Sequence, residues 1–117
     1  MQDATAVLRV GDYERAKEFY IEKLGFEVKE EGGDPAGFGI FRRDKAQVFL
    51  ESWQGAEAPY DRWRVYIHVD DIESYAQEFR EKGITFSHEV TTTEYGMREF
   101  EIADPDGNVV CFGMDIG

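Results

Sequence analysis

The chain has 117 residues and a mass of 13.5 kDa, which suits one domain with its own hydrophobic core. Apolar residues make up 42% of the sequence and aromatic residues 15%, which excludes a disordered protein. The formal net charge of −12, from 25 acidic and 13 basic residues, argues against binding to nucleic acid phosphates.

Two segments of the sequence predict helices. Asp12 and Asp71 suit the N-cap position, and an acidic residue follows each of them in the first turn. Gly25 and Gly83 are placed to end the two helices in the left-handed conformation. Apolar residues recur between these ends at helical spacing: Ala16, Phe19, Tyr20 and Leu24 in the first segment, and Ile72, Tyr75, Ala76 and Phe79 in the second.

The other apolar segments predict strands. A short strand precedes each helix, and the remaining strands are expected at residues 27–30, 38–41, 47–50, 85–90, 98–103 and 109–114. The Asp-Gly pair of residues 104–107 predicts a tight turn between the last two strands. Residues 31–37 and 53–62 contain Gly, Pro and acidic residues and are expected to be loops.

The second half of the sequence repeats the first. Leu8 corresponds to Ile67 and Asp12 to Asp71, at a constant offset of 59 residues. A second match, from Phe41 to Ile102, has an offset of 61 residues and continues into the next strand. Two copies indicate paired modules and not a solenoid. We therefore expect two βαβββ modules, at about residues 1–55 and 62–117.

No run of about 18 apolar residues is present, so no membrane-spanning segment is expected. The N-terminal residues lack the basic and apolar pattern of a secretory signal. The single cysteine, Cys111, excludes an internal disulfide and suits a reducing compartment. The sequence therefore predicts a cytoplasmic protein.

Five sequence segments, taken together in this order and spacing, carry a family resemblance: 8–12 (LRVGD), 16–20 (AKEFY), 24–26 (LGF), 95–100 (YGMREF) and 104–108 (DPDGN). The chain resembles the vicinal-oxygen-chelate superfamily of glyoxalases, bleomycin-resistance proteins and dioxygenases, and most of all its bleomycin-resistance proteins. The resemblance implies an α+β fold in which the two modules form an open, cup-shaped mixed sheet with the helices outside. It also implies a homodimer, whose contact could involve Trp53 and Trp63.

Metal-dependent members of this superfamily bind a divalent ion through His, Glu or Gln side chains at four related strand positions. The resemblance and the repeat offsets assign these positions to Thr5, Leu50, Arg64 and Cys111. Leucine has no donor atom, and the guanidinium of arginine has no lone pair for a metal. Glu51 should face the other side of the sheet, because strand side chains alternate. We expect no metal and no other cofactor, unless a bulge or a misalignment of the strand lets Glu51 and His68 form a residual site.

Side-chain alternation also predicts the residues that line the ligand cleft. From four strands in chain order they are Thr5, Val7 and Arg9; Val48, Leu50 and Ser52; Arg64, Tyr66 and His68; and Val109 and Cys111. Such a lining, of mixed polarity and with aromatic surface, is typical of a small-molecule site.

The candidate ligand-binding residues are Phe38, Ser52, Arg64, Tyr66, His68, Tyr95 and Glu99. In bleomycin-resistance proteins an aromatic residue before the glycine of the 95–100 motif stacks on flat parts of the antibiotic, and the resemblance gives this role to Tyr95. Phe38 and Tyr66 would form further walls, and Glu99 would attract a cationic part of the ligand.

Three of these candidates have an alternative interpretation. Arg64 could bind a carboxylate ligand, or it could form an ion pair with Glu99 or Glu101. His68 could be a structural histidine, and Phe38 could belong to the core.

Three functions remain open from the sequence. The first is a non-catalytic protein that sequesters a bleomycin-like or other cationic aromatic compound and so confers antibiotic resistance. The second is a metal-dependent lyase, isomerase or dioxygenase of the same superfamily. The third is a regulatory domain whose cleft is filled by its own side chains. Fold-level kinship does not choose among them.

Overall fold

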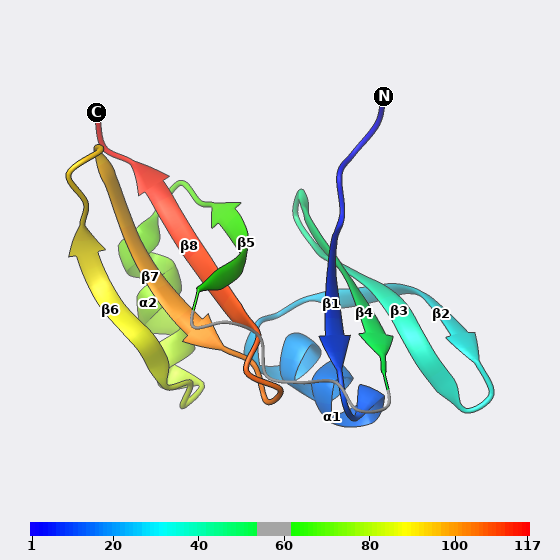
Figure 1. Cartoon of the computed structure of the whole chain (residues 1–117). Helices are drawn as coiled ribbons and strands as arrows, with labels where there is room; N and C mark the ends of the chain where they lie inside the picture. Colours follow the sequence, from blue (N-terminus) through cyan, green and yellow to red (C-terminus); the bar gives the residue numbers. More distant parts are fainter. Residues whose placement is uncertain (54–61) are drawn as a thin grey trace. The chain divides into compact units, whose positions relative to one another are not determined.

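The computed structural model describes residues 1–53 and 62–117, in two compact units, Met1–Ala58 and Pro59–Gly117 (Figure 1). Unit 1 contains β1 (Ala6–Val10), α1 (Tyr13–Glu18), the π-helical turn η1 (Phe19–Lys23), β2 (Glu27–Gly33), β3 (Ala36–Arg43) and β4 (Ala46–Ser52). Unit 2 contains β5 (Trp63–His68), α2 (Ile72–Glu81), β6 (Phe86–Thr92), β7 (Met97–Ala103) and β8 (Val109–Asp115). The predicted α+β fold, with a βαβββ order in each half, is confirmed.

Both helices begin and end where the sequence predicts. The carboxylate of Asp12 accepts a hydrogen bond from the backbone N–H of Arg15, and Asp71 does the same for Ser74. These bonds satisfy N–H groups that have no partner inside a helix. Gly25 and Gly83 follow the helices with φ of 76° and 77°. The first helix differs from the prediction in one respect, because it finishes as the π-helical turn η1.

Each unit folds around a four-stranded mixed sheet. The strand order is β1-β4-β3-β2 in unit 1 and β5-β8-β7-β6 in unit 2. The strand that precedes the helix pairs in parallel with the last strand of its unit, and the other pairs are antiparallel. The two units therefore have the same topology, as the repeat predicts.

A hydrophobic core lies between the helix and one face of the sheet in each unit. In unit 2 the ring of Phe79 on α2 lies 6.0 Å from that of Phe100 and 5.2 Å from that of Phe112. Burying one such side chain stabilises the fold by about 1.5–3 kcal/mol. The most buried side chains are Leu8, Val10, Tyr20, Leu24, Phe41, Val48 and Leu50 in unit 1, and Ile72, Phe79, Phe100, Ile102 and Val110 in unit 2. We call the sheet face that carries no helix the open face of each unit.

The prediction of a loop at residues 31–37 is wrong for most of its length. β2 runs to Gly33 and β3 begins at Ala36, so the two strands extend into the segment as a long hairpin. Gly32 permits this pairing, because a side chain there would overlap the ring of Phe38. The predicted loop at 53–62 lies largely outside the described residues. Within the described residues, no helix is long and apolar enough to cross a membrane.

The predicted turn before β8 depends on a buried carboxylate. Asp104, 5% exposed, accepts hydrogen bonds from the backbone N–H groups of Asp106 and Asn108 and from the Asn108 side chain, at 2.9–3.0 Å. The backbone of Gly107 closes the turn on the Asp104 carbonyl at 3.0 Å.

We expect Asp104→Ala to lower the free energy of unfolding by about 3 kcal/mol, because it leaves buried N–H donors without an acceptor. Urea denaturation measures the change. Asp70→Ala, at an exposed position before α2, is the matched control and should change stability by less than about 0.5 kcal/mol. Equal effects of the two substitutions would contradict the structural role of Asp104.

Candidate functional site

The open face of unit 2 brings four of the predicted site residues together. Tyr66 and His68 project from β5, and Glu99 projects from β7 toward the same side. Tyr95 lies in the turn before β7. This face therefore carries phenol, imidazole and carboxylate groups within one small area.

The carboxylate of Glu99 is the centre of this group. The hydroxyl of Tyr66 donates a hydrogen bond to its Oε2 at 2.8 Å, and the hydroxyl of Tyr95 donates one to its Oε1 at 3.0 Å. Glu99 is only 9% exposed, so these bonds stabilise a charge that is largely removed from water.

Tyr66 reaches Glu99 because Gly113 has no side chain. The two residues are separated by β8, which lies between β5 and β7. The Tyr66 ring crosses β8 at Gly113, where an added Cβ would overlap the phenol. The backbone of Gly113 does not have positive φ, so its conformation does not require a glycine. The close approach of the Tyr66 ring does.

Aromatic rings flank this network along β5. The ring of Trp63 lies 5.5 Å from that of Tyr66, edge to face, and the His68 ring lies 5.0 Å from it. The prediction that Arg64 alternates with Tyr66 is wrong, because the pairing with β8 is interrupted by a bulge between Trp63 and Val65. Trp63 therefore takes the place on the open face that alternation assigns to Arg64.

The hydroxyl and thiol groups here are weak acids. Burial, and then the bond to Glu99, raises the pKa of Tyr66 above its ordinary value. The bond to Glu99 raises the pKa of Tyr95 as well. Burial raises the pKa of the Cys111 thiol to about 12, with further contributions from the negative charges of Glu99 and Glu101. All three groups therefore keep their protons at neutral pH.

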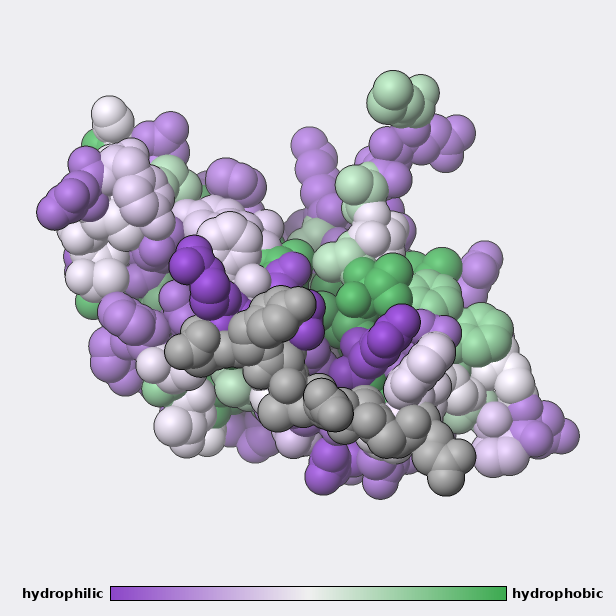
Figure 2. Space-filling model, viewed as in Figure 1, coloured by the Kyte–Doolittle hydropathy of each residue, from purple (hydrophilic) through white to green (hydrophobic). Residues whose placement is uncertain are grey.

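The open face of unit 1 carries an apolar and aromatic surface next to the charged pair of positions Arg9 and Glu51. Phe38 on β3 stacks on Phe49 of β4, with ring centroids 5.7 Å apart and planes 14° apart. Val7 on β1 pairs in register with Phe49 and is 58% exposed. The guanidinium of Arg9 lies 4.2 Å from the ring centre of Trp53. Figure 2 shows the resulting hydrophobic surface, in green, over β1, β4 and β3. Phe38, 43% exposed, is therefore no core residue.

The predicted orientation of β4 is wrong by one residue. Val48 and Leu50 are fully buried against the helix and do not line the open face, and Ser52 follows their alternation at the exposed end of the strand. The sequence predicted that Glu51 faces the side of the sheet away from the cleft. In the structure it lies on the open face with Phe49, and it pairs in register with Arg9 of β1. The reason is the connection before β8: five residues separate the paired Ala103 and Val109, whereas four separate the equivalent pair Arg42 and Gln47. The repeat offset is therefore 62 in the last strand.

This correction changes the set of residues at the metal-ligand positions. Cys111 pairs with Tyr66, and the equivalent pair in unit 1 is Phe49 with Val7, so Phe49 replaces Leu50 in the set. The four positions then hold Thr5, Phe49, Trp63 beside the bulged Arg64, and Cys111. Thr5 accepts a hydrogen bond from the Gln47 side chain, and Cys111 keeps its proton. These residues do not fit a divalent ion, which requires several deprotonated or neutral nitrogen and oxygen donors.

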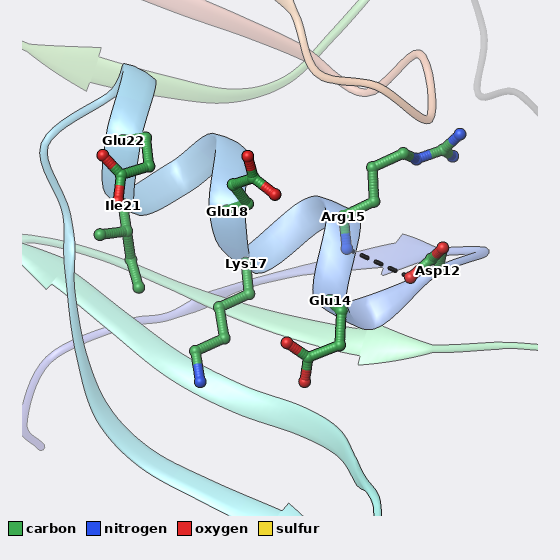
Figure 3. Close-up of a pocket in the computed structure, with 7 residues that line it drawn as sticks. All are labelled: Asp12, Glu14, Arg15, Lys17, Glu18, Ile21 and Glu22. Carbon is green, nitrogen blue, oxygen red and sulfur yellow. Dashed lines mark hydrogen bonds between the residues drawn. The ribbon is translucent and has the colours of Figure 1, made fainter.

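No other metal site emerges from residues 1–53 and 62–117, where no three His, Cys, Asp or Glu side chains lie close enough to share an ion. A shallow hollow runs along the outer surface of α1 and η1 (Figure 3). Its charged side chains spread apart and do not converge on a common point, and the Asp12 carboxylate there is used by the helix N-terminus. The hollow is therefore a solvated helix surface.

The seven predicted site residues divide between the two units. Unit 2 holds Arg64, Tyr66, His68, Tyr95 and Glu99, and unit 1 holds Phe38 and Ser52. Phe49, Trp63 and Gly113 were not among the sequence candidates. The longer turn at 104–108 is visible in the sequence, and it could have identified Phe49 as the equivalent of Cys111. No residue pattern predicts the bulge at Arg64 or the position of the Tyr66 ring above Gly113.

Solved structures with the same fold include binding proteins and an enzyme. A bleomycin-binding protein solved with bleomycin is 22% identical, with a TM-score of 0.83 over 98% of this chain and 99% of that chain. TnmS3, an antibiotic-binding protein from Streptomyces sp. CB03234, is 23% identical, with a TM-score of 0.75 and 97% of each chain covered. A lactoylglutathione lyase from Agrobacterium tumefaciens is 19% identical, with a TM-score of 0.76 over 97% of this chain and 92% of that chain. At these identities the likeness concerns the fold alone.

The sequence itself matches a family model. No curated protein sequence shows a significant match. The model of the glyoxalase/bleomycin resistance protein/dioxygenase superfamily matches residues 3–112, which is nearly the whole chain. The chain therefore belongs to the glyoxalase/bleomycin resistance protein/dioxygenase superfamily.

Proposed function

We propose that this protein binds and sequesters a small cationic aromatic compound of the bleomycin type, without transforming it. The observation that carries the proposal is the position of Phe49. An aromatic ring stands there at a place where metal-dependent relatives have a ligand, and it is stacked on the exposed ring of Phe38. An aromatic pair with one exposed and one half-buried ring suits the stacking of a flat ligand.

Each open face, taken by itself, offers one kind of contact that suits such a compound. Phe38, Phe49 and Val7 in unit 1 offer apolar contact. Glu99 in unit 2 offers a negative charge, and the net charge of −12 favours the approach of a cation. Among solved relatives with this fold, one is complexed with bleomycin and another is described as antibiotic-binding, which supports the same class of ligand.

Covalent chemistry has little support at this site. A nucleophilic thiol needs a lowered pKa, and the pKa of Cys111 is raised. A general base needs a pKa near the working pH, and the pKa of Tyr66 is raised further from neutrality. The Tyr66 hydroxyl is therefore suited to act as a fixed hydrogen-bond donor, and Cys111 is suited to apolar packing. Neither group is suited to act as a reactant.

We further propose a homodimer in the cytoplasm. Trp53 and Trp63 are 46% and 42% exposed, more than large aromatic side chains usually are in a monomer, which favours a subunit contact. The free, buried Cys111 is compatible with a reducing compartment. Sedimentation equilibrium at micromolar concentration tests the dimer, and a mass of one chain would contradict it.

We expect bleomycin to raise the melting temperature of the metal-stripped protein by about 10 °C at 100 times its dissociation constant, because ligand binding adds roughly 2.7 kcal/mol there. A thermal-shift assay measures this, with nickel, zinc, manganese and iron in a parallel arm. A rise with metal alone would contradict the proposal and favour a metal-dependent enzyme of the superfamily.

We expect Phe38→Ala to weaken bleomycin binding about tenfold, because it removes the exposed half of the aromatic stack. Isothermal titration calorimetry measures the affinity. Ile21→Ala removes a half-buried apolar side chain from the helix surface and is the control, with unchanged affinity expected. Equal losses in the two variants would exclude a role for the stack.

We expect Cys111 in the folded protein to react with iodoacetamide more than about 1,000-fold more slowly at about pH 8 than in the unfolded chain, where the thiol pKa is about 8.5. The difference follows from the folded pKa of about 12 and from complete burial. Mass spectrometry follows the alkylation. Equal rates in the two states would contradict the burial and the raised pKa of the thiol, and a faster rate in the folded protein would favour an enzyme.

A further inference from the structure

The carboxylate of Glu99 holds two donors, one on each oxygen. The Tyr66 hydroxyl lies 2.8 Å from Oε2 and the Tyr95 hydroxyl 3.0 Å from Oε1. Both donors are neutral phenols, and none of the ion pairs among the described residues includes Glu99. Among residues 1–53 and 62–117, this largely buried negative charge therefore has no ion-pair partner on the open sheet face.

We infer that Glu99 recognises an amidinium or guanidinium group of the ligand through two parallel N–H···O bonds. These planar cations place two N–H donors in a fork that matches the two oxygens of a carboxylate. A simple ammonium ion lacks this geometry. The inference rests on the proposed function and names the chemical group that the site would select.

The Glu99 carboxylate can accept this cation and keep its hydrogen bond from Tyr66. Each carboxylate oxygen has two acceptor sites, so Oε2 can keep the Tyr66 bond and accept one N–H of the cation. Tyr66 itself is fixed, because its ring crosses β8 at Gly113. Oε1 has the same capacity, but Tyr95 is the solvent-exposed donor, so its hydroxyl is the one that an incoming cation displaces.

Tyr95 is suited to move aside. Its side chain is 69% exposed, so little packing holds it. The turn that carries it is fixed independently, since the backbone N–H and the side-chain oxygen of Thr93 both bond to the Met97 backbone carbonyl, and the Thr93 side chain accepts the Met97 N–H. The Tyr95 ring can therefore rotate away from Glu99 while the backbone of the turn stays in place.

The surroundings favour a flat cation in particular. The rings of Trp63, Tyr66 and His68 follow one another along β5, with centroid distances of 5.5 and 5.0 Å. A delocalised cation gains from an aromatic face beside its carboxylate partner. Because water is partly excluded at Glu99, the charge-assisted bonds are stronger than they would be at an exposed carboxylate.

Three benzene derivatives test the inference, because they differ in the head group: benzamidine, benzylamine and benzamide. Titration of the ¹⁵N-labelled protein, followed through the amide signals of Gly96 and Glu99, should give an affinity at least about fivefold higher for benzamidine than for benzylamine, and no binding of benzamide. Equal affinity for benzamidine and benzylamine would overturn the recognition of a fork.

Variants separate Glu99 from general charge effects. Glu99→Gln should weaken benzamidine binding about tenfold or more, whereas Glu101→Gln makes the same change of charge two residues away on the same strand and should have little effect. Tyr95→Phe removes the competing donor and should strengthen binding about threefold, which keeps the test decisive if Glu99→Gln is unstable. Equal losses in Glu99→Gln and Glu101→Gln, or weaker binding in Tyr95→Phe, would overturn the inference.

A bleomycin arm distinguishes this inference from the proposed function. Bleomycin binding that is unaffected by Glu99→Gln would overturn the inference and leave sequestration standing. A wild-type protein that binds benzamidine through Glu99 but does not bind bleomycin would contradict sequestration of that antibiotic and support the selection of an amidinium group.

Discussion

The carboxylate of Glu99, held by two phenols, determines the chemistry of the open face of unit 2. It depends on a chain of local conditions: a glycine at 113, a tyrosine that crosses β8 above it, and a turn that presents Tyr95 from the other side. Each condition is needed, because a buried carboxylate without donors would be costly. Burial and the bond to Glu99 raise the pKa of Tyr66, and the bond to Glu99 raises the pKa of Tyr95. Burial, with the charges of Glu99 and Glu101, raises the pKa of Cys111, so none of these groups is poised to react.

The two units show how one topology supports two surfaces. Both have a helix on one sheet face and the same strand order, and their cores use equivalent positions. On the open faces, residues that occupy equivalent places differ in kind: Phe49 in unit 1 corresponds to Cys111 in unit 2, and Val7 corresponds to Tyr66. Core packing constrains the sheet face that contacts the helix in each unit. The open face is not constrained in this way, and it carries stacked aromatic rings in unit 1 and polar groups in unit 2. In this chain the two sheets share a topology and differ in the groups on their open faces, so the topology alone does not indicate function.

The sequence was sufficient for the architecture and for part of the site. The helix caps at Asp12 and Asp71 and the half-chain repeat follow from local chemistry, and they predicted the order of elements correctly. Alternation along β5 correctly grouped Tyr66 with His68. The prediction failed on β4, because a one-residue difference in turn length reverses every side chain of a strand, and at Arg64, because a bulge does the same locally. Long-range contacts such as that between Tyr66 and Glu99 leave no local signal in the sequence.

We propose that the open sheet faces bind a small molecule without a metal, and the location of the bound ligand tests this proposal. Bleomycin added to the metal-stripped, isotope-labelled protein should shift the ring and amide signals of Phe38, Phe49, Tyr66, Tyr95 and Glu99 by more than those of the helix surface around Glu14, Glu18 and Glu22. Shifts confined to that helix surface, or shifts that require an added divalent metal, would contradict the account.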